Sequence, residues 1–118
     1  AQDLSFVVAH GNGNQKSDSS EARALETAFG HQAIPVTALK WLMGHTLCAS
    51  GLLDVVLAVK ALQEQKIPSV GHQEQARACQ SLDLVSQTRD IENPDAKAMV
   101  INRGFASMNA VVFIEAIA

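Results

Sequence analysis

Blocks of apolar residues along the chain predict four strands. Residues 4–9 (Leu-Ser-Phe-Val-Val-Ala) and 35–39 (Pro-Val-Thr-Ala-Leu) are short apolar runs rich in β-branched side chains, which is typical of buried strands. Residues 98–102 and 109–114 are two further such runs, and the six residues between them contain one glycine. This spacing predicts a β-hairpin whose loop can reach a functional site.

Helical spacing appears in two other segments. Residues 22–29 place Ala and Leu on one helical face, with a loose capping box between Asp18 and Glu21 before them and Gly30 after them. Residues 51–65 predict a second helix whose apolar residues cover more than one stripe. A helix of this kind is buried on several sides, so we expect it between layers.

The remaining segments predict turns and loops. His10 is followed by Gly-Asn-Gly-Asn, which favours a tight turn with positive φ angles. Residues 71–94 are polar and weakly patterned, which indicates a long loop with at most one short strand. Read in order, the elements are β-α-β-α-loop-β-β, and this order predicts α/β or mixed packing.

Composition narrows the classes of function. A chain of 118 residues with 47% hydrophobic and 18% charged residues can bury a single core. The formal charge of -3, the absence of a basic cluster and the scarcity of aromatic residues argue against nucleic-acid binding. The longest apolar stretch, residues 52–62, contains Asp54 and Lys60 and is too short to span a membrane.

Cysteine usage and the start of the chain suggest a compartment. Cys48 and Cys79 allow at most one disulfide, which fits a reducing environment better than a disulfide framework. The first residues carry no basic segment of a signal peptide. We therefore expect a cytoplasmic protein without interaction with nucleic acid or membrane.

Three segments together resemble the C-terminal half of a β-ketoacyl-acyl-carrier-protein synthase, or ketosynthase. Residues 8–14 (VAHGNGN), followed by Asp18, Glu21 and Ala22, resemble the family's EAHGTGT…GD..EA signature, with asparagine for both threonines. Residues 40–51 (KWLMGHTLCASG) resemble K…GHTLGASG, with Cys48 in place of glycine. Residues 103–110 (RGFASMNA) resemble FGFGGTNA and differ at four of the eight positions. The three motifs keep their order and spacing across nearly the whole chain.

The resemblance implies a thiolase-like, layered α/β/α fold with a mixed sheet, of which residues 1–118 would be an incomplete C-terminal domain. It also implies a site. His10 and His45 would donate N–H groups to the thioester oxygen of a malonyl unit while decarboxylation makes an enolate. Lys40, paired with Asp54 fourteen residues later, would support the histidines. Phe105 would gate the acyl pocket, and Asn12 would lie beside the site.

Part of the family's active site is missing from these residues. The family carries its acyl chain on a cysteine in an N-terminal half, and the resemblance therefore implies that the chain needs that half. It further implies acyl carrier protein as the partner that brings acyl and malonyl groups, and a homodimer or ketosynthase heterodimer as the assembly. No cofactor and no metal ion are implied.

Each candidate residue also has a simpler interpretation. His10 can be a turn residue that ends a strand, and Lys40 can be a solvated surface charge. Gly44 before His45 suits a close backbone approach. Cys48 lies at a helix N-terminus three residues after His45, where a thiol can become nucleophilic, but a small buried residue is the simpler interpretation. His31 and His72 lie in expected loops, and the His45-x-x-Cys48 spacing is only half of a zinc site.

The leading hypothesis is an acyltransferase of the ketosynthase type, acting in fatty-acid or polyketide biosynthesis by decarboxylative Claisen condensation. The first alternative is a non-catalytic partner of the chain-length-factor kind within a ketosynthase heterodimer; the substitutions at 12, 14 and 103 fit this alternative, whereas the two histidines oppose it. The second alternative is an independent small binding domain.

Overall fold

A computed structural model describes residues 3–30, 32–71 and 82–117. Its elements in chain order are β1 (Phe6–Val8), α1 (Gln15–Phe29), β2 (Pro35–Thr37), α2 (Lys40–Met43), the short 3₁₀ helix η1 (Leu47–Ala49), α3 (Ser50–Glu64), β3 (Lys66–Ile67), β4 (Asp83–Leu84), β5 (Arg89–Asp90), β6 (Lys97–Arg103) and β7 (Asn109–Glu115).

A five-stranded mixed sheet forms the centre of the molecule, with strand order β4-β2-β1-β6-β7. Strand β1 is parallel to both of its neighbours, β2 and β6, and β2 is parallel to β4. Strands β6 and β7 form the expected antiparallel hairpin, from the pair of Lys97 with Glu115 to the pair of Arg103 with Asn109. Strands β3 and β5 form a separate two-stranded antiparallel sheet.

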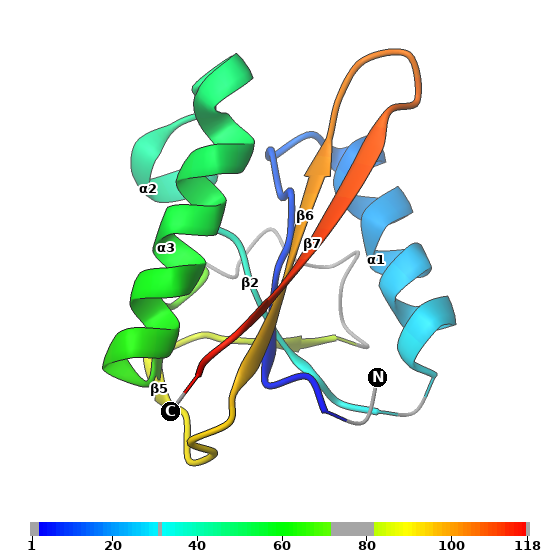
Figure 1. Cartoon of the computed structure of the whole chain (residues 1–118). Helices are drawn as coiled ribbons and strands as arrows, with labels where there is room; N and C mark the ends of the chain where they lie inside the picture. The colour runs from blue at the N-terminus through cyan, green and yellow to red at the C-terminus, as the bar shows by residue number, and fades with distance from the viewer. Residues whose placement is uncertain (1–2, 31, 72–81, 118) are drawn as a thin grey trace.

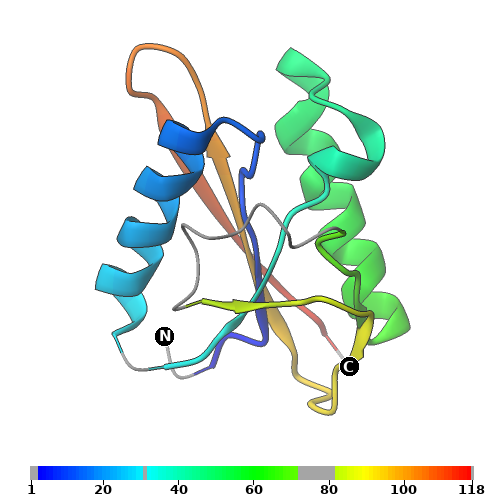
Figure 2. The same ribbon diagram turned by 180° about the vertical axis from the view of Figure 1, so that it is seen from behind.

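The two long helices cover opposite faces of this sheet, as Figures 1 and 2 show. Alternate residues of β1 point to the two faces, as the pleat of a strand requires. Phe6 and Val8 pack in one buried cluster with Ala58 and Leu62 of α3. Val7 packs in a second cluster that includes Leu25 of α1 and Val36 of β2. The layered α/β/α arrangement predicted from the sequence is confirmed.

Helix α1 begins earlier than its apolar spacing predicts. Its N-cap is Asn14, whose side chain accepts hydrogen bonds from the backbone N–H groups of Lys16 and Ser17. The predicted capping box between Asp18 and Glu21 is therefore wrong, and Glu21 serves another purpose described below. The predicted end is correct, because Gly30 is the C-cap with φ of 59°.

Helix α3 differs from its prediction in burial. Its inner face, including Ala58, Ala61 and Leu62, is buried against the sheet as expected. Leu52 and Val56, on the other side of the helix, are 68% and 54% exposed. In the part of the chain that the structure describes, the expectation of burial on several sides is therefore wrong, because no layer covers this outer face.

The segment read as a long loop contains more structure than expected. Strands β4 and β5 lie within it, two residues each, where at most one strand was predicted. Val85 is buried, whereas Leu82 and Leu84 are half-buried. The possible pairing of Cys79 and the surroundings of His31 and His72 lie outside the described residues. No helix within the described ranges is long and apolar enough to cross a membrane.

Candidate active site

His10 lies two residues after the end of the central strand β1, next to Ala9. It is buried, with 3% of its surface exposed. Gly11 follows with φ of 45°, and Gly13 has φ of 83°, so the predicted positive-φ turn is confirmed. A Cβ on Gly11 would lie 2.5 Å from Cβ of Ala38, next to β2. Glycine at position 11 therefore lets the turn run close to the neighbouring strand.

Glu21 of α1 holds the backbone of this turn. One carboxylate oxygen accepts a hydrogen bond from the His10 N–H at 2.9 Å, and the other accepts from the Gly11 N–H at 3.1 Å. The Glu21 side chain is buried, so its contact with His10 is shielded from water, and its contact with Gly11 is partly shielded. Sequence reasoning assigned Glu21 to a motif and a cap but missed this contact, which depends on how α1 packs against the turn.

The ring of His10 has a defined orientation. The backbone N–H of Arg103, at the end of β6, donates to His10 Nδ1 at 3.3 Å. A backbone amide can only donate, so this Nδ1 carries no hydrogen and the neutral ring bears its hydrogen on Nε2.

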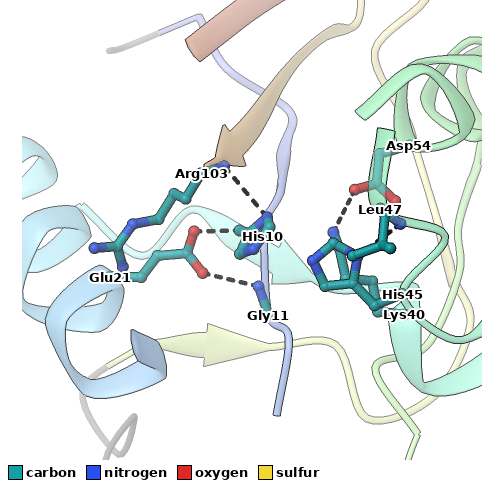
Figure 3. A network of polar contacts seen from close by, with 8 residues as sticks. All are labelled: His10, Gly11, Glu21, Lys40, His45, Leu47, Asp54 and Arg103. Atoms are coloured by element: carbon teal, nitrogen blue, oxygen red, sulfur yellow. Dashed lines mark hydrogen bonds and ion pairs between the residues drawn. The ribbon is translucent and has the colours of Figure 1, made fainter. Parts of the chain in front are cut away.

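His45 lies opposite His10, in the turn between α2 and η1. Its Nδ1 accepts a hydrogen bond from the Leu47 N–H at 3.1 Å, which again leaves Nε2 as the N–H donor of the neutral ring. The two ring centroids are 5.4 Å apart and the ring planes meet at 80°. Figure 3 shows the two imidazoles side by side, with His45 on the α3 side of His10.

Gly44 before His45 has φ of 75°. A Cβ at this position would meet nothing within 4 Å, so the expected close backbone approach is wrong here. The positive φ alone accounts for glycine.

Lys40 and Asp54 form a buried ion pair behind His45. Lys40 Nζ lies 2.8 Å from Asp54 Oδ2, and the side chains are 4% and 1% exposed. The pairing proposed from the sequence is confirmed, and the interpretation of Lys40 as a solvated charge is wrong. The second carboxylate oxygen of Asp54 is buried without a hydrogen-bond partner among the described residues. This pair joins α2 to α3 and keeps a positive charge beside the histidines.

Asn102 of β6 connects the site to the start of α3. A Cβ added to Gly51 would lie 2.6 Å from Asn102 Nδ2, so the helix packs closely on this side chain. The Asn102 side chain also acts on His10, since it raises the pKa of that imidazole. Sequence reasoning missed Asn102, although its place at the end of an apolar strand, one residue before the third motif, is a usable signal.

The environment of His10 favours the neutral imidazole. Burial lowers the pKa of His10, the charge of Lys40 lowers it further, and His45 and Arg103 act in the same direction, whereas the Asn102 side chain raises it. The neighbouring carboxyl of Asp18 also favours its neutral form, because burial and the charge of Glu21 raise the pKa of Asp18. The neutral His10 imidazole can therefore act as a hydrogen-bond donor without any change in its protonation.

This shift predicts a dependence of stability on pH. In the unfolded chain His10 takes up a proton near its ordinary pKa of 6.5, whereas the folded protein resists that proton until a lower pH. The contribution of His10 to the free energy of unfolding should be fully present above this ordinary pKa. As the pH drops toward the pKa of folded His10, the free energy of unfolding should fall by up to about 1.4 kcal/mol per pH unit. Urea unfolding between pH 7.5 and 5 measures it. A His10→Gln variant should lose part of this slope; an unchanged slope would contradict the assignment.

The contacts of Glu21 make a second prediction. In Glu21→Gln one of the two backbone N–H groups faces the amide NH₂ and loses its acceptor, so we expect a loss of about 1.5–3 kcal/mol in the free energy of unfolding. Glu92→Gln makes the same chemical change at an exposed loop position and should cost less than about 0.5 kcal/mol. Equal effects of the two substitutions in urea denaturation would show that Glu21 does not support the turn.

Three predicted residues are not joined to this cluster by any contact described in the structure. Asn12 is exposed, and its side chain accepts from the Asn14 N–H within the turn. Phe105 lies in the hairpin loop with 88% of its surface exposed. Cys48 is a free, exposed cysteine in η1, which contradicts the interpretation of a small buried residue. Among the described residues, no three His, Cys, Asp or Glu side chains are grouped to hold a metal ion.

Comparison with known proteins decides the family. Residues 1–74 match the sequence model described as "Beta-ketoacyl synthase, C-terminal domain". The chain belongs to the β-ketoacyl synthase family. The match includes His10, Lys40, His45 and Asp54, whereas Asn102 and Arg103 lie beyond its last residue.

Relatives of this β-ketoacyl synthase domain come from polyketide biosynthesis. The granaticin polyketide putative beta-ketoacyl synthase 2 of Streptomyces violaceoruber is 36% identical over 112 residues, which cover 95% of this chain and 27% of the relative. The chain therefore spans about a quarter of that relative's length.

Solved ketosynthases share the fold of this domain. The ishigamide ketosynthase/chain length factor superposes with a TM-score of 0.90 at 24% identity, over 99% of this chain and 29% of the other. A type II polyketide synthase acyl-carrier protein in complex with its ketosynthase bound to the hexaketide gives 0.87 at 25% identity, over 98% of this chain and 29% of the other. These similarities confirm the thiolase-like fold predicted from the motifs.

Proposed function

We propose that the chain forms the histidine-bearing part of a polyketide-type ketosynthase that condenses acyl and malonyl thioesters. The observation that carries this proposal is the pair of imidazoles, 5.4 Å apart, each with Nδ1 occupied by a backbone N–H and Nε2 left as the donor. Two such donors fit the single oxygen of a thioester that becomes an enolate.

The proposed reaction proceeds in two steps. The malonyl thioester loses CO₂, and the electron pair of the broken C–C bond forms an enolate whose oxygen is held by His10 and His45. The enolate carbon then attacks the acyl thioester carbonyl, a new C–C bond forms, and the thiolate leaves. The acyl group would be carried by the cysteine of an N-terminal half of the same fold, as the family resemblance implies. Lys40 and Asp54 would hold His45 and the local positive charge in place.

The exposed apolar residues support an additional layer. The outer face of α3, helix α2 and the 3₁₀ helix η1 expose large apolar side chains, namely Trp41, Leu42, Met43, Leu47, Leu52, Val56 and Val59. Patches of this extent are seldom left in water by a monomeric protein. They favour an N-terminal half packed on α3 over an independent small binding domain. Acyl carrier protein as the substrate carrier, Phe105 as a gate and Asn12 beside the site belong to the same proposal, as does a homodimer or heterodimer.

The experiment that tests the proposal is decarboxylation of malonyl-acyl carrier protein by the intact protein, measured as the release of CO₂. A chain-length-factor-like partner is the second candidate, because a ketosynthase/chain length factor shares the fold and because the motifs differ at positions 12, 14 and 103. Release of CO₂ that depends on both His10 and His45 supports the proposed ketosynthase activity. A folded protein that releases none, alone or with a ketosynthase subunit added, contradicts it.

A further inference from the structure

Arg103 is the position at which the third motif departs most in chemistry from the family pattern, because arginine replaces phenylalanine. It is the last residue of β6 and pairs with Asn109 across the hairpin. The residues that follow, 104–108, form an exposed loop in which Ala106 and Ser107 both have positive φ angles. Arg103 therefore lies where the regular sheet ends and the loop begins.

The side chain of Arg103 reaches from the sheet to helix α1. Its Nη1 donates to the backbone oxygen of Ser17 at 2.9 Å, and its Nη2 lies 3.5 Å from Ser20 Oγ. Ser17 and Arg103 are 86 residues apart in sequence. The guanidinium thus connects the end of β6 to the first two turns of α1, a connection that a phenylalanine cannot make.

The backbone of the same residue contacts the histidine, since the Arg103 N–H donates to His10 Nδ1. We propose that Arg103 is a positioning residue: by fixing the end of β6 to α1, its side chain keeps this N–H against Nδ1 and so keeps the hydrogen of His10 on Nε2. The inference rests on the proposed function, in which that Nε2 hydrogen contacts the thioester oxygen.

Helix α1 then holds His10 in two independent ways. Glu21 accepts from the His10 backbone N–H, and Arg103, anchored on Ser17, donates to the ring. Figure 3 shows Glu21 reaching His10 from the α1 side and the Arg103 N–H reaching it from the end of β6, with His45 and Lys40 on the other side of His10. Backbone and ring are therefore fixed relative to one rigid helix, which is the condition for a preorganised donor.

The charge of Arg103 acts in the same direction. It is one of the positive charges that lower the pKa of His10, after burial, Lys40 and His45. Removing it should therefore raise the pKa of His10 while the other causes remain.

The test compares Arg103→Met with Arg23→Met in the intact protein. Arg23 is exposed on α1, and its Nε bonds to Ser19 O within the helix, so its loss removes the same charge without contact to His10. Long-range ¹H–¹⁵N spectra of histidine-labelled protein report the tautomer and the pKa of His10, with His10→Gln used for assignment. Decarboxylation of malonyl-acyl carrier protein reports kcat and KM.

For Arg103→Met we expect a mixture of tautomers, a higher pKa of His10 and a fall in kcat of at least about tenfold with little change in KM, because the donor is misplaced and not lost. Arg103→Lys should restore part of each, and Arg23→Met should match the wild type. A wild-type tautomer and pKa in folded Arg103→Met overturn the proposal.

If Arg103→Met does not fold, Arg103→Gln provides the same test, because its side chain is too short to reach Ser17 and the tautomer and pKa of His10 can be measured in the same way. A wild-type protein without decarboxylase activity sinks the proposed function, and the spectra still decide the role of Arg103.

Discussion

Replacing Asp54 by alanine, or Lys40 by methionine, should lower the free energy of unfolding by about 3–5 kcal/mol, which is the cost of breaking a buried ion pair. The Nζ–Oδ2 distance is 2.8 Å and both side chains are almost completely buried. Each single substitution leaves the other charge in the interior without its partner. Urea denaturation of the intact protein, followed by circular dichroism, measures the loss.

Two controls separate this effect from a general loss of charge. Lys60 and Glu64 form an ion pair on the exposed face of α3, with side chains 63% and 56% exposed, and Lys60→Met should cost no more than about 0.5 kcal/mol. The double variant Lys40→Met/Asp54→Leu removes both buried charges and should recover much of the loss. A double variant as unstable as the sum of the singles would show that the two residues contribute independently of their pairing.

Replacing His10 or His45 by alanine should lower the rate of malonyl decarboxylation by about 10²–10³-fold, the usual effect of removing one donor from an oxyanion site. Each ring presents one Nε2–H, so each substitution removes half of the proposed donor set. The effect should appear in kcat, because the negative charge that these donors stabilise develops on the thioester oxygen only as CO₂ leaves. CO₂ release by the intact protein, measured under saturating malonyl-acyl carrier protein, gives the ratio.

Glutamine variants supply the control, since the amide of glutamine retains an N–H donor. His10→Gln and His45→Gln should therefore keep more activity than the alanine variants at equal stability. Because the two donors act on one oxygen, the double alanine variant should be only slightly slower than the poorer single variant. Full activity in either alanine variant would exclude that histidine from the donor set.

Local patterns were sufficient for much of the fold. The apolar runs at 4–9, 35–39, 98–102 and 109–114 all contain strands, since alternation and β-branched side chains act within a few residues. Gly30 ends α1 for an equally local reason. Helix α2 was not predicted, because its four residues, Lys40–Met43, are too few to show helical periodicity.

The start of α1 was misplaced for a different reason. Several residues before it can cap a helix, and only the contact of the Asn14 side chain with Lys16 and Ser17 shows which one does. The exposure of Leu52 and Val56 was also missed, since an apolar helix looks the same in sequence whether or not its second layer is present.

The amino-acid sequence by itself named the residues that we propose for the site, because motifs that resemble those of the family contain His10, His45 and Lys40. It also predicted the pairing of Lys40 with Asp54, which the structure confirms. The tertiary structure alone decided how the site is held. The contact of Arg103 with His10 joins residues 93 positions apart, and the contact of Glu21 with His10 spans 11 positions across the turn that precedes α1. Such contacts depend on the packing of α1 and β6 on β1, and no local pattern encodes that packing.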